Sequence, residues 1–228
     1  MNDVSSIAFV RGKAGPCPVL SPFRWQTRLQ LTDYIKLLMN IVCIAWGSLL
    51  WKPGPLKLAS AWHPGGPRLP IEFVRDSDDS AEVALVLCEG ARLQSTYWAY
   101  LATQDVIEAR AMVGAREKIT PAWPDWIGSI PGREGAVEDP RIAAWLREQR
   151  IDAAVWTALP AKSHKVSGRV PSAREVVATL DAMPPEQRAE AEHYVRCTPA
   201  HIDTDYRRAI EAALGWCAAR DAHVTRTR

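Results

Sequence analysis

The sequence lacks the features by which several classes of protein are recognised. Its five cysteines (Cys17, Cys43, Cys88, Cys197 and Cys217) are odd in number and widely scattered, and none forms a C-x-x-C pair. This pattern is typical of a reduced cytoplasmic protein and argues against a disulfide scaffold or a zinc site. An excess of one charge is also missing, because the formal net charge is only +2. Such a composition does not indicate a nucleic-acid-binding protein.

Long hydrophobic runs are missing too. The most apolar stretch, Leu37 to Trp51, is shorter than the roughly 20 residues that a membrane-spanning helix needs, and Gly47 and Ser48 interrupt it. We therefore expect no membrane association, although a short anchor is an alternative. The better interpretation is a buried strand that runs into a turn.

Residues 1–38 look like an N-terminal extension. Their apolar residues follow neither the helical nor the strand periodicity, and Pro16, Pro18 and Pro22 interrupt the segment. Charged residues also occur where a cleavable signal peptide would have its apolar core. We expect this segment to be poorly ordered or not native, with Met39 as the alternative start. One domain then covers residues 39–216, and residues 217–228 form a basic tail.

Hydrophobic patterning predicts a sheet followed by helices. The expected strands are residues 41–45, 69–75, 81–88, 96–101 and 151–159, with a hairpin turn at 76–80. The expected helices cover about 103–118 with Thr103 as cap, then 140–149 after Asp139, and three segments that begin at Ser172, at Pro185 and after Asp203. The order indicates an α+β fold. We expect a small mixed β-barrel at about 40–160, peripheral helices, and a helical region at about 170–216.

Gly47 and Ser48 form the first candidate site. They follow the expected strand at 41–45. Glycine lets the backbone turn sharply and approach a ligand, and successive N–H groups in such a turn form a concave anion site. Ser48 adds a hydroxyl group. An ordinary turn is the simpler alternative.

Glu117 is the second candidate. On a helical wheel it falls on the same face as Val106 and Val113, which we expect to point into the core, and Arg110 falls near that face as well. An inward carboxylate tends to have a raised pKa, which suits a general acid or base near neutral pH. The alternative is a glutamate in the frayed last turn of a helix.

Other residues give weaker signals. The five histidines have no metal-ligand spacing, so we expect no metal site, and the sequence contains no P-loop, Rossmann fingerprint or G-x-S-x-G motif. Arg75 closes a strand and could bind a substrate carboxylate or be an exposed edge charge. A lone nucleophilic cysteine is left open, but Cys43 and Cys88 lie in apolar runs typical of inert buried thiols.

The segments around Gly47-Ser48 and around Glu117 together resemble two motifs of one protein family. The segment CIAWGSLLWKPG is similar to the glycine-serine loop of γ-glutamylcyclotransferases, and is nearest to the ChaC-type branch. The segment AREKI is similar to the Arg-Glu-Lys segment that carries the catalytic glutamate of that branch, and PRLPIEFVRDS lies where the branch has its Leu-Pro-Gly and aromatic-Arg segment. The resemblance covers about residues 40–160.

The resemblance implies a cofactor-independent enzyme on a small mixed β-barrel. In that family the loop holds the carboxylate of a γ-glutamyl substrate, and the glutamate takes a proton from the α-amine, which attacks its own γ-carbonyl and releases 5-oxoproline. Gly47, Ser48 and Leu49 match the loop, Glu117 matches the acid/base, and Arg75 is expected to contact the substrate.

The sequence also departs from the family pattern. Trp46 replaces the tyrosine of the loop, although we expect it too to contact the substrate, and the segment after Lys118 differs from the ChaC-type continuation. The identity of the γ-glutamyl compound and the oligomeric state stay open. One alternative is a binding module on the same fold for a small anionic ligand or a peptide end. Another is a scaffold whose basic C-terminal helices dock a protein, with Arg196, Arg207 and Arg208 at the interface.

Overall fold

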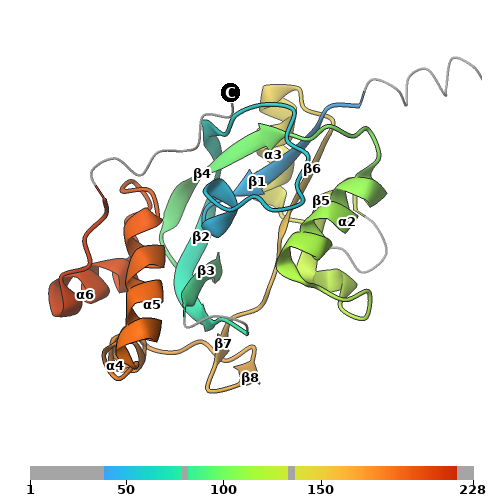
Figure 1. Ribbon diagram of the computed structural model, residues 1–228. Coiled ribbons are helices and arrows are strands. Elements are labelled where there is room, and N and C mark those ends of the chain that lie inside the picture. Colours follow the sequence, from blue (N-terminus) through green and yellow to red (C-terminus); the bar gives the residue numbers. More distant parts are fainter. Residues whose placement is uncertain (1–38, 79–81, 133–136, 220–228) are drawn as a thin grey trace, which may run out of the picture. The chain divides into compact units, whose positions relative to one another are not determined.

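The structure, a computed structural model, describes residues 39–78, 82–132 and 137–219 (Figure 1). All of these belong to the unit that extends from Leu38 to Arg228. The expectations for residues 1–38, and for most of the basic tail, fall outside the described residues and stay predictions.

A mixed sheet of eight strands forms the centre of the fold. Its strands are β1 (Ile41–Ala45), β2 (His63–Asp76), β3 (Val83–Leu87), β4 (Leu93–Tyr100), β5 (Ile127–Ile130), β6 (Ala153–Thr157), β7 (Lys162–Ser163) and β8 (Val166–Ser167). They pair in the order β5-β6-β1-β4-β2-β7-β8, and β3 pairs with β2. The expected mixture of helices and a mixed sheet is confirmed. Within the described residues, however, no pairing joins β5 to β8, so the sheet is not closed into a barrel.

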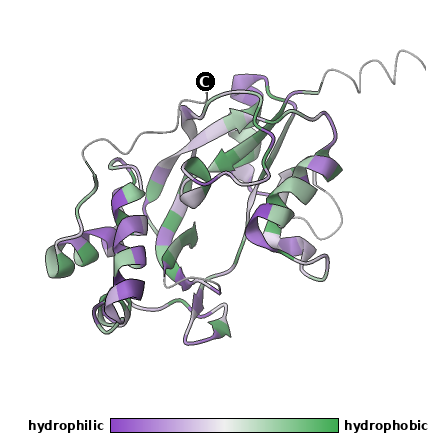
Figure 2. Ribbon diagram, in the orientation of Figure 1, coloured by the Kyte–Doolittle hydropathy of each residue, from purple (hydrophilic) through white to green (hydrophobic). Residues whose placement is uncertain are grey.

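The five α-helices of the described residues lie around this sheet (Figure 1). They are α2 (Val106–Glu117), α3 (Pro140–Gln149), α4 (Ala173–Asp181), α5 (Pro185–Cys197) and α6 (Asp205–Leu214). Helices α4, α5 and α6 gather on one side of the sheet, whereas α2 lies on the other side against β1, β5 and β6. Figure 2 shows hydrophobic residues concentrated on the central strands and a mostly hydrophilic α5.

Strand β1 is buried on both of its faces. Val42 and Ile44 pack in a core cluster with α3, α4, α5 and α6, whereas Ile41, Cys43 and Ala45 pack in a second cluster with α2. A strand covered on both faces reads as a continuous apolar run, which explains the sequence that resembled a membrane anchor. No helix among the described residues has the length and apolar character to cross a membrane.

Most of the expected element boundaries are confirmed. Asp139 caps α3 ahead of Pro140, Ser172 and Glu175 form a capping box at α4, and Gly215 ends α6 in a left-handed conformation. Three differences stand out. Asp105 caps α2 instead of Thr103, whose hydroxyl binds the Asp105 N–H. Strand β2 extends well beyond the expected 69–75, and β5, β7 and β8 were not predicted because each is too short to show a pattern.

Arg207 joins α5 to α6 from inside the protein. Its side chain is only 2 % exposed, and it donates hydrogen bonds to the carbonyl oxygens of Pro199, Ile202 and Thr198 at 2.7, 2.9 and 3.0 Å. It therefore belongs to the packing of the helical region and is not part of a basic docking surface. This removes one of the three arginines on which the scaffold alternative depended.

We predict that Arg207→Leu destabilises the protein by about 3 kcal/mol, because the apolar side chain leaves several buried carbonyl groups without a donor. Chemical denaturation measures this change. Arg208→Leu is the matched control, since its side chain is half exposed and binds Asp203 at the surface, where a pair contributes about 0–1 kcal/mol. Equal effects of the two substitutions would contradict the anchoring role.

Candidate active site

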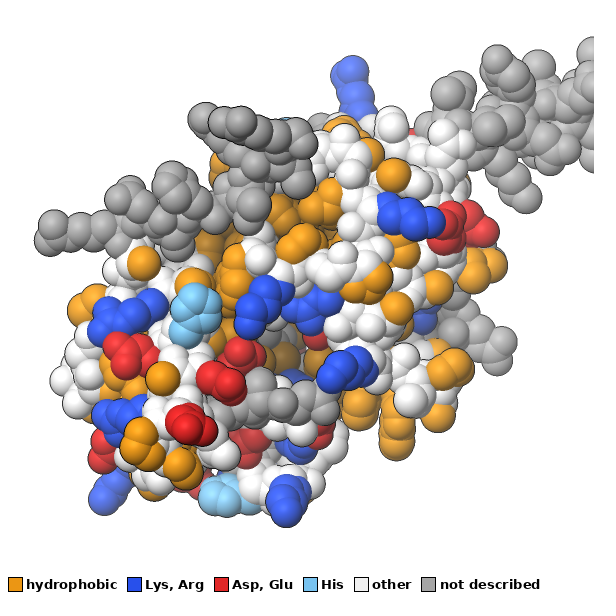
Figure 3. Space-filling model, in the orientation of Figure 1, with side chains coloured by type: hydrophobic (Ala, Val, Ile, Leu, Met, Phe, Trp, Pro, Cys, Tyr) orange, Lys and Arg blue, Asp and Glu red, His pale blue; other side chains and the backbone are white. Residues whose placement is uncertain are grey.

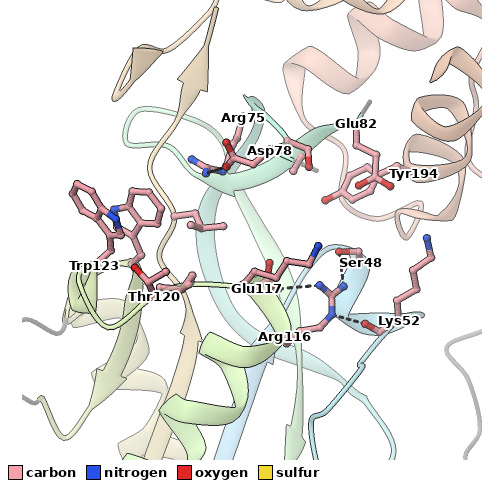
Figure 4. Close-up of a pocket in the computed structure, with 16 residues that line it drawn as sticks. Ser48, Lys52, Arg75, Asp78, Glu82, Arg116, Glu117, Thr120, Trp123 and Tyr194 are labelled. Atoms are coloured by element: carbon pink, nitrogen blue, oxygen red, sulfur yellow. Dashed lines mark hydrogen bonds and ion pairs between the residues drawn. The ribbon is translucent and has the colours of Figure 1, made fainter. Parts of the chain in front are cut away.

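A cavity of about 650 Å³ lies between the β2–β3 hairpin, the C-terminal end of α2 and the segment that follows α2. The charged and polar side chains that line it include Ser48, Lys52, Arg75, Asp78, Glu82, Arg116, Glu117 and Tyr194. Figure 4 shows how these side chains lie around the cavity. In the space-filling view, basic and acidic side chains gather around a hollow in this region (Figure 3).

The glycine-serine loop enters the cavity at the end of β1. Strand β1 ends at Ala45, and a single turn of 3-10 helix, η2 (Ser48–Leu50), begins directly after Gly47. The first N–H groups of a helix have no acceptor within it. In the part of the chain that the structure describes, the N–H groups of Ser48 and Leu49 have no acceptor elsewhere either. The loop thus offers donors beside the Ser48 hydroxyl.

Tyr194 of α5 explains why position 47 is a glycine. A Cβ atom at Gly47 would lie 2.6 Å from the Tyr194 hydroxyl oxygen, closer than any real contact allows. The same oxygen accepts a hydrogen bond of 3.1 Å from the Leu85 N–H of β3. Burial raises the pKa of Tyr194, so the phenol stays protonated. Tyr194 therefore fixes the distance between the loop, β3 and the helical region.

Arg116 connects the loop to the end of α2. Its Nε donates to the Lys52 carbonyl oxygen at 2.7 Å and its Nη2 donates to the Ser48 hydroxyl oxygen at 3.1 Å (Figure 4). Its Nη1 lies 3.6 Å from Oε1 of Glu117. The two segments that resemble the γ-glutamylcyclotransferase motifs are thus in direct contact through one side chain.

Glu117 is the last residue of α2 and points into the cavity, not into bulk solvent. Only 17 % of its side chain is exposed. Burial raises the pKa of Glu117, and the charges of Arg116 and Arg75 oppose this effect without cancelling it. A carboxylate whose pKa is raised is a stronger proton acceptor than an ordinary glutamate. The inward orientation expected from the helical wheel is confirmed, and a frayed, exposed position is excluded.

Arg75 is also buried, with 5 % of its side chain exposed, so the alternative of an exposed edge charge is wrong. A β-bulge between Phe73 and Arg75 changes the register of the β2–β3 pair. The guanidinium donates to the Pro160 carbonyl oxygen at 2.9 Å and to Asp78 at 2.7 Å. Arg75 lines the cavity with its charge already paired.

Trp46 and Leu49 have their side chains in the core and do not line the large cavity. The Trp46 indole N–H donates to the Leu85 carbonyl oxygen at 3.0 Å, and Leu49 packs on the α2 side of β1. With Gly47 they line a smaller cavity of about 50 Å³, whose lining also includes Ser48, Glu117 and Tyr194. Their expected contact with a substrate stays a prediction.

Several residues of the cavity were missed by sequence reasoning. Lys52, Glu82, Trp123, Trp126 and Tyr194 come from four separate segments that only the fold brings together, the two tryptophans sharing one of them. The one available signal was Tyr194, an aromatic residue in a mostly polar helix. Its contact with Gly47 joins residues far apart in the sequence, and no pattern in either segment indicates it.

The remaining candidates gain no support as sites. No group of three or more His, Cys, Asp and Glu side chains that could hold a metal ion occurs among the described residues. Cys43 is completely buried, and burial, together with the nearby Glu117, raises its pKa to about 12. Such a thiol is inert.

Comparisons with models of protein families, with curated proteins and with solved structures found no match.

The contact between Gly47 and Tyr194 leads to a prediction. Gly47→Ala should destabilise the protein by about 1–3 kcal/mol, because the new Cβ atom overlaps the phenol oxygen. In the Tyr194→Phe background the next ring atom lies 3.6 Å from that Cβ, an ordinary contact, so the cost of Gly47→Ala should largely disappear. A double-mutant cycle by denaturant unfolding measures this coupling. Additive effects would show that Tyr194 does not set the requirement for glycine.

Proposed function

We propose that the protein is a γ-glutamylcyclotransferase-like enzyme. Its substrate is a γ-glutamyl amide, and the reaction is intramolecular acyl transfer. The substrate α-amine loses a proton to Glu117 and attacks the γ-carbonyl carbon. The bond between that carbon and the leaving nitrogen then breaks, the leaving amine takes up the proton held by Glu117, and 5-oxoproline forms. Positioning and proton transfer are the main requirements, so the proposal includes no cofactor.

One observation carries this proposal: the buried carboxyl group of Glu117 and the Ser48 loop line the same cavity. The loop offers N–H groups and a hydroxyl group for the substrate carboxylate, and Lys52 adds a positive charge at that end. The raised pKa of Glu117 suits the proton transfer. A barrel-like curvature of the sheet is part of the proposal. It is supported by the way β2 pairs with β4 over its first half and with β3 over its second.

The alternatives have less support. A binding module in which Trp46 reshapes the large cavity has no support, because the Trp46 indole is hydrogen-bonded in the core and does not line that cavity. The scaffold hypothesis needed a basic surface that includes Arg207, which is buried. A reducing, cytoplasmic location belongs to the proposal, in keeping with the free thiols of the four described cysteines.

We predict that Glu117→Gln lowers the rate of 5-oxoproline release by about 100-fold or more, the range expected for removing a general acid or base. The assay measures 5-oxoproline from a panel of γ-glutamyl amines, γ-glutamyl peptides and glutathione. Glu108→Gln is the matched control, because Glu108 lies on the exposed side of the same helix and binds Lys57. Release that is insensitive to Glu117→Gln, or no release by folded wild-type protein from the whole panel, would contradict the proposal.

The raised pKa of Glu117 leads to a prediction about pH. Because the base must be ionised, kcat/KM should rise with pH through a midpoint above about 4.3, the ordinary value for glutamate. A midpoint at or below that value would contradict a buried base.

The same group should affect stability without any substrate. A carboxyl group whose pKa is higher in the folded than in the unfolded protein stabilises the fold when protonated, at low pH, and this contribution is lost as the pH rises through the folded pKa. The melting temperature of Glu117→Gln relative to wild type should therefore increase from pH 4 to pH 8. Glu108→Gln should not show this trend, because Glu108 is exposed and its pKa is lowered.

A further inference from the structure

The cavity has two ends of different chemistry. Ser48, Lys52 and Arg116 lie on one side of Glu117, and Trp123 lies on the opposite side (Figure 4). The first end is polar and basic, whereas Trp123 and Trp126 give the second end an aromatic wall. A ligand that spans the cavity therefore needs a polar part and an apolar part, joined near Glu117.

The aromatic wall is a stacked pair of indole rings. Trp123 and Trp126 have ring centroids 5.0 Å apart and an interplanar angle of 16°. The Arg75 guanidinium lies 5.5 Å from the centroid of the Trp126 ring. Trp123 nevertheless remains 51 % exposed, which is unusual for a tryptophan with so much apolar surface. It presents ring surface to the cavity that no side chain covers completely.

The pair is held by the same helix that carries Glu117. Both tryptophans belong to or border the 3-10 helix η3 (Pro124–Trp126). Arg110 of α2 donates to the Pro124 carbonyl oxygen at 2.8 Å and to the Ser129 hydroxyl oxygen at 3.1 Å. The aromatic wall is thus anchored to α2 at a fixed position relative to the proposed base.

The charges at this end do not favour a second carboxylate. Arg75 already binds Asp78, and Asp78 also binds Lys162. With its charge paired, the guanidinium serves as part of the wall behind Trp126. An uncharged planar group fits this surface better than the terminal carboxylate of a peptide, because indole rings attract aromatic rings by offset stacking.

We propose that Trp123 is a specificity-determining residue that binds an aromatic ring in the amine part of the substrate. The substrate class is then a γ-glutamyl amide of an aromatic amine. This inference rests on the proposed function, which places the γ-glutamyl group at the Ser48 end and the reacting carbonyl beside Glu117. The leaving amine must then extend toward Trp123.

Binding of two matched probes to the Glu117→Gln protein tests the inference without turnover. The probes are γ-glutamylanilide and γ-glutamylmethylamide, which differ only in the amine part, and calorimetry measures their Kd values. We expect the anilide to bind about tenfold more tightly, the upper range for one aromatic pair. Trp123→Leu should remove most of this preference. Ile107→Ala should leave it unchanged, because Ile107 is an exposed apolar residue of α2 that does not line the cavity.

Equal affinity for the two probes, or a preference that Trp123→Leu leaves intact, would overturn the inference. The 5-oxoproline assay separates this failure from failure of the proposed function. Release from both amides at similar kcat/KM supports the reaction and overturns the aromatic preference. Preferential release from the anilide that falls with Trp123→Leu, through KM more than kcat, supports both. If neither amide releases 5-oxoproline while another member of the panel does, the inference is overturned and the proposed reaction is supported. If no member of the panel releases it, both are overturned, because the inference requires the γ-glutamyl group beside Glu117.

Discussion

The contact of Arg116 with the glycine-serine loop is the interaction on which the rest of the site depends. A buried carboxyl group needs a nearby positive charge to ionise at an acceptable cost in free energy. Arg116 provides this charge to Glu117, and its own position is fixed by the Ser48 hydroxyl and the Lys52 carbonyl. One guanidinium therefore contacts both the carboxyl group proposed to transfer the proton and the loop proposed to bind the substrate carboxylate.

Tyr194 fixes the loop from the opposite direction. The phenol oxygen occupies the space where a Cβ atom at Gly47 would lie and accepts a hydrogen bond from the Leu85 N–H, so α5 is packed close to both the loop and β3. This contact gives the helical region at 173–214 a role in the geometry of the cavity. Arg207 supports that role indirectly, because it donates hydrogen bonds to the carbonyl oxygens of Val195 and Thr198 at the C-terminal end of α5, the helix from which Tyr194 projects.

The sequence predicts the elements of this fold better than their assembly. Patterns that depend on local chemistry were confirmed, such as the Ser172 capping box and the inward face of Glu117. The sheet order could not be predicted, because short strands such as β5 pair with segments distant in the sequence. The burial of Arg75 was also missed. It depends on Asp78, Pro160 and Trp126, which meet only in the folded protein.

Glu117 is a carboxyl group that the fold keeps in an unfavourable environment. A carboxyl group with a raised pKa costs stability whenever it is ionised, so the rest of the fold must offset that cost. Strand β1 contributes both to the stability that offsets this cost and to the site that incurs it. Its two buried faces join the core clusters on either side of the sheet, and its end delivers the loop that Arg116 binds. The most hydrophobic segment of the chain thus stabilises the protein at the point where the cavity needs a rigid, polar wall.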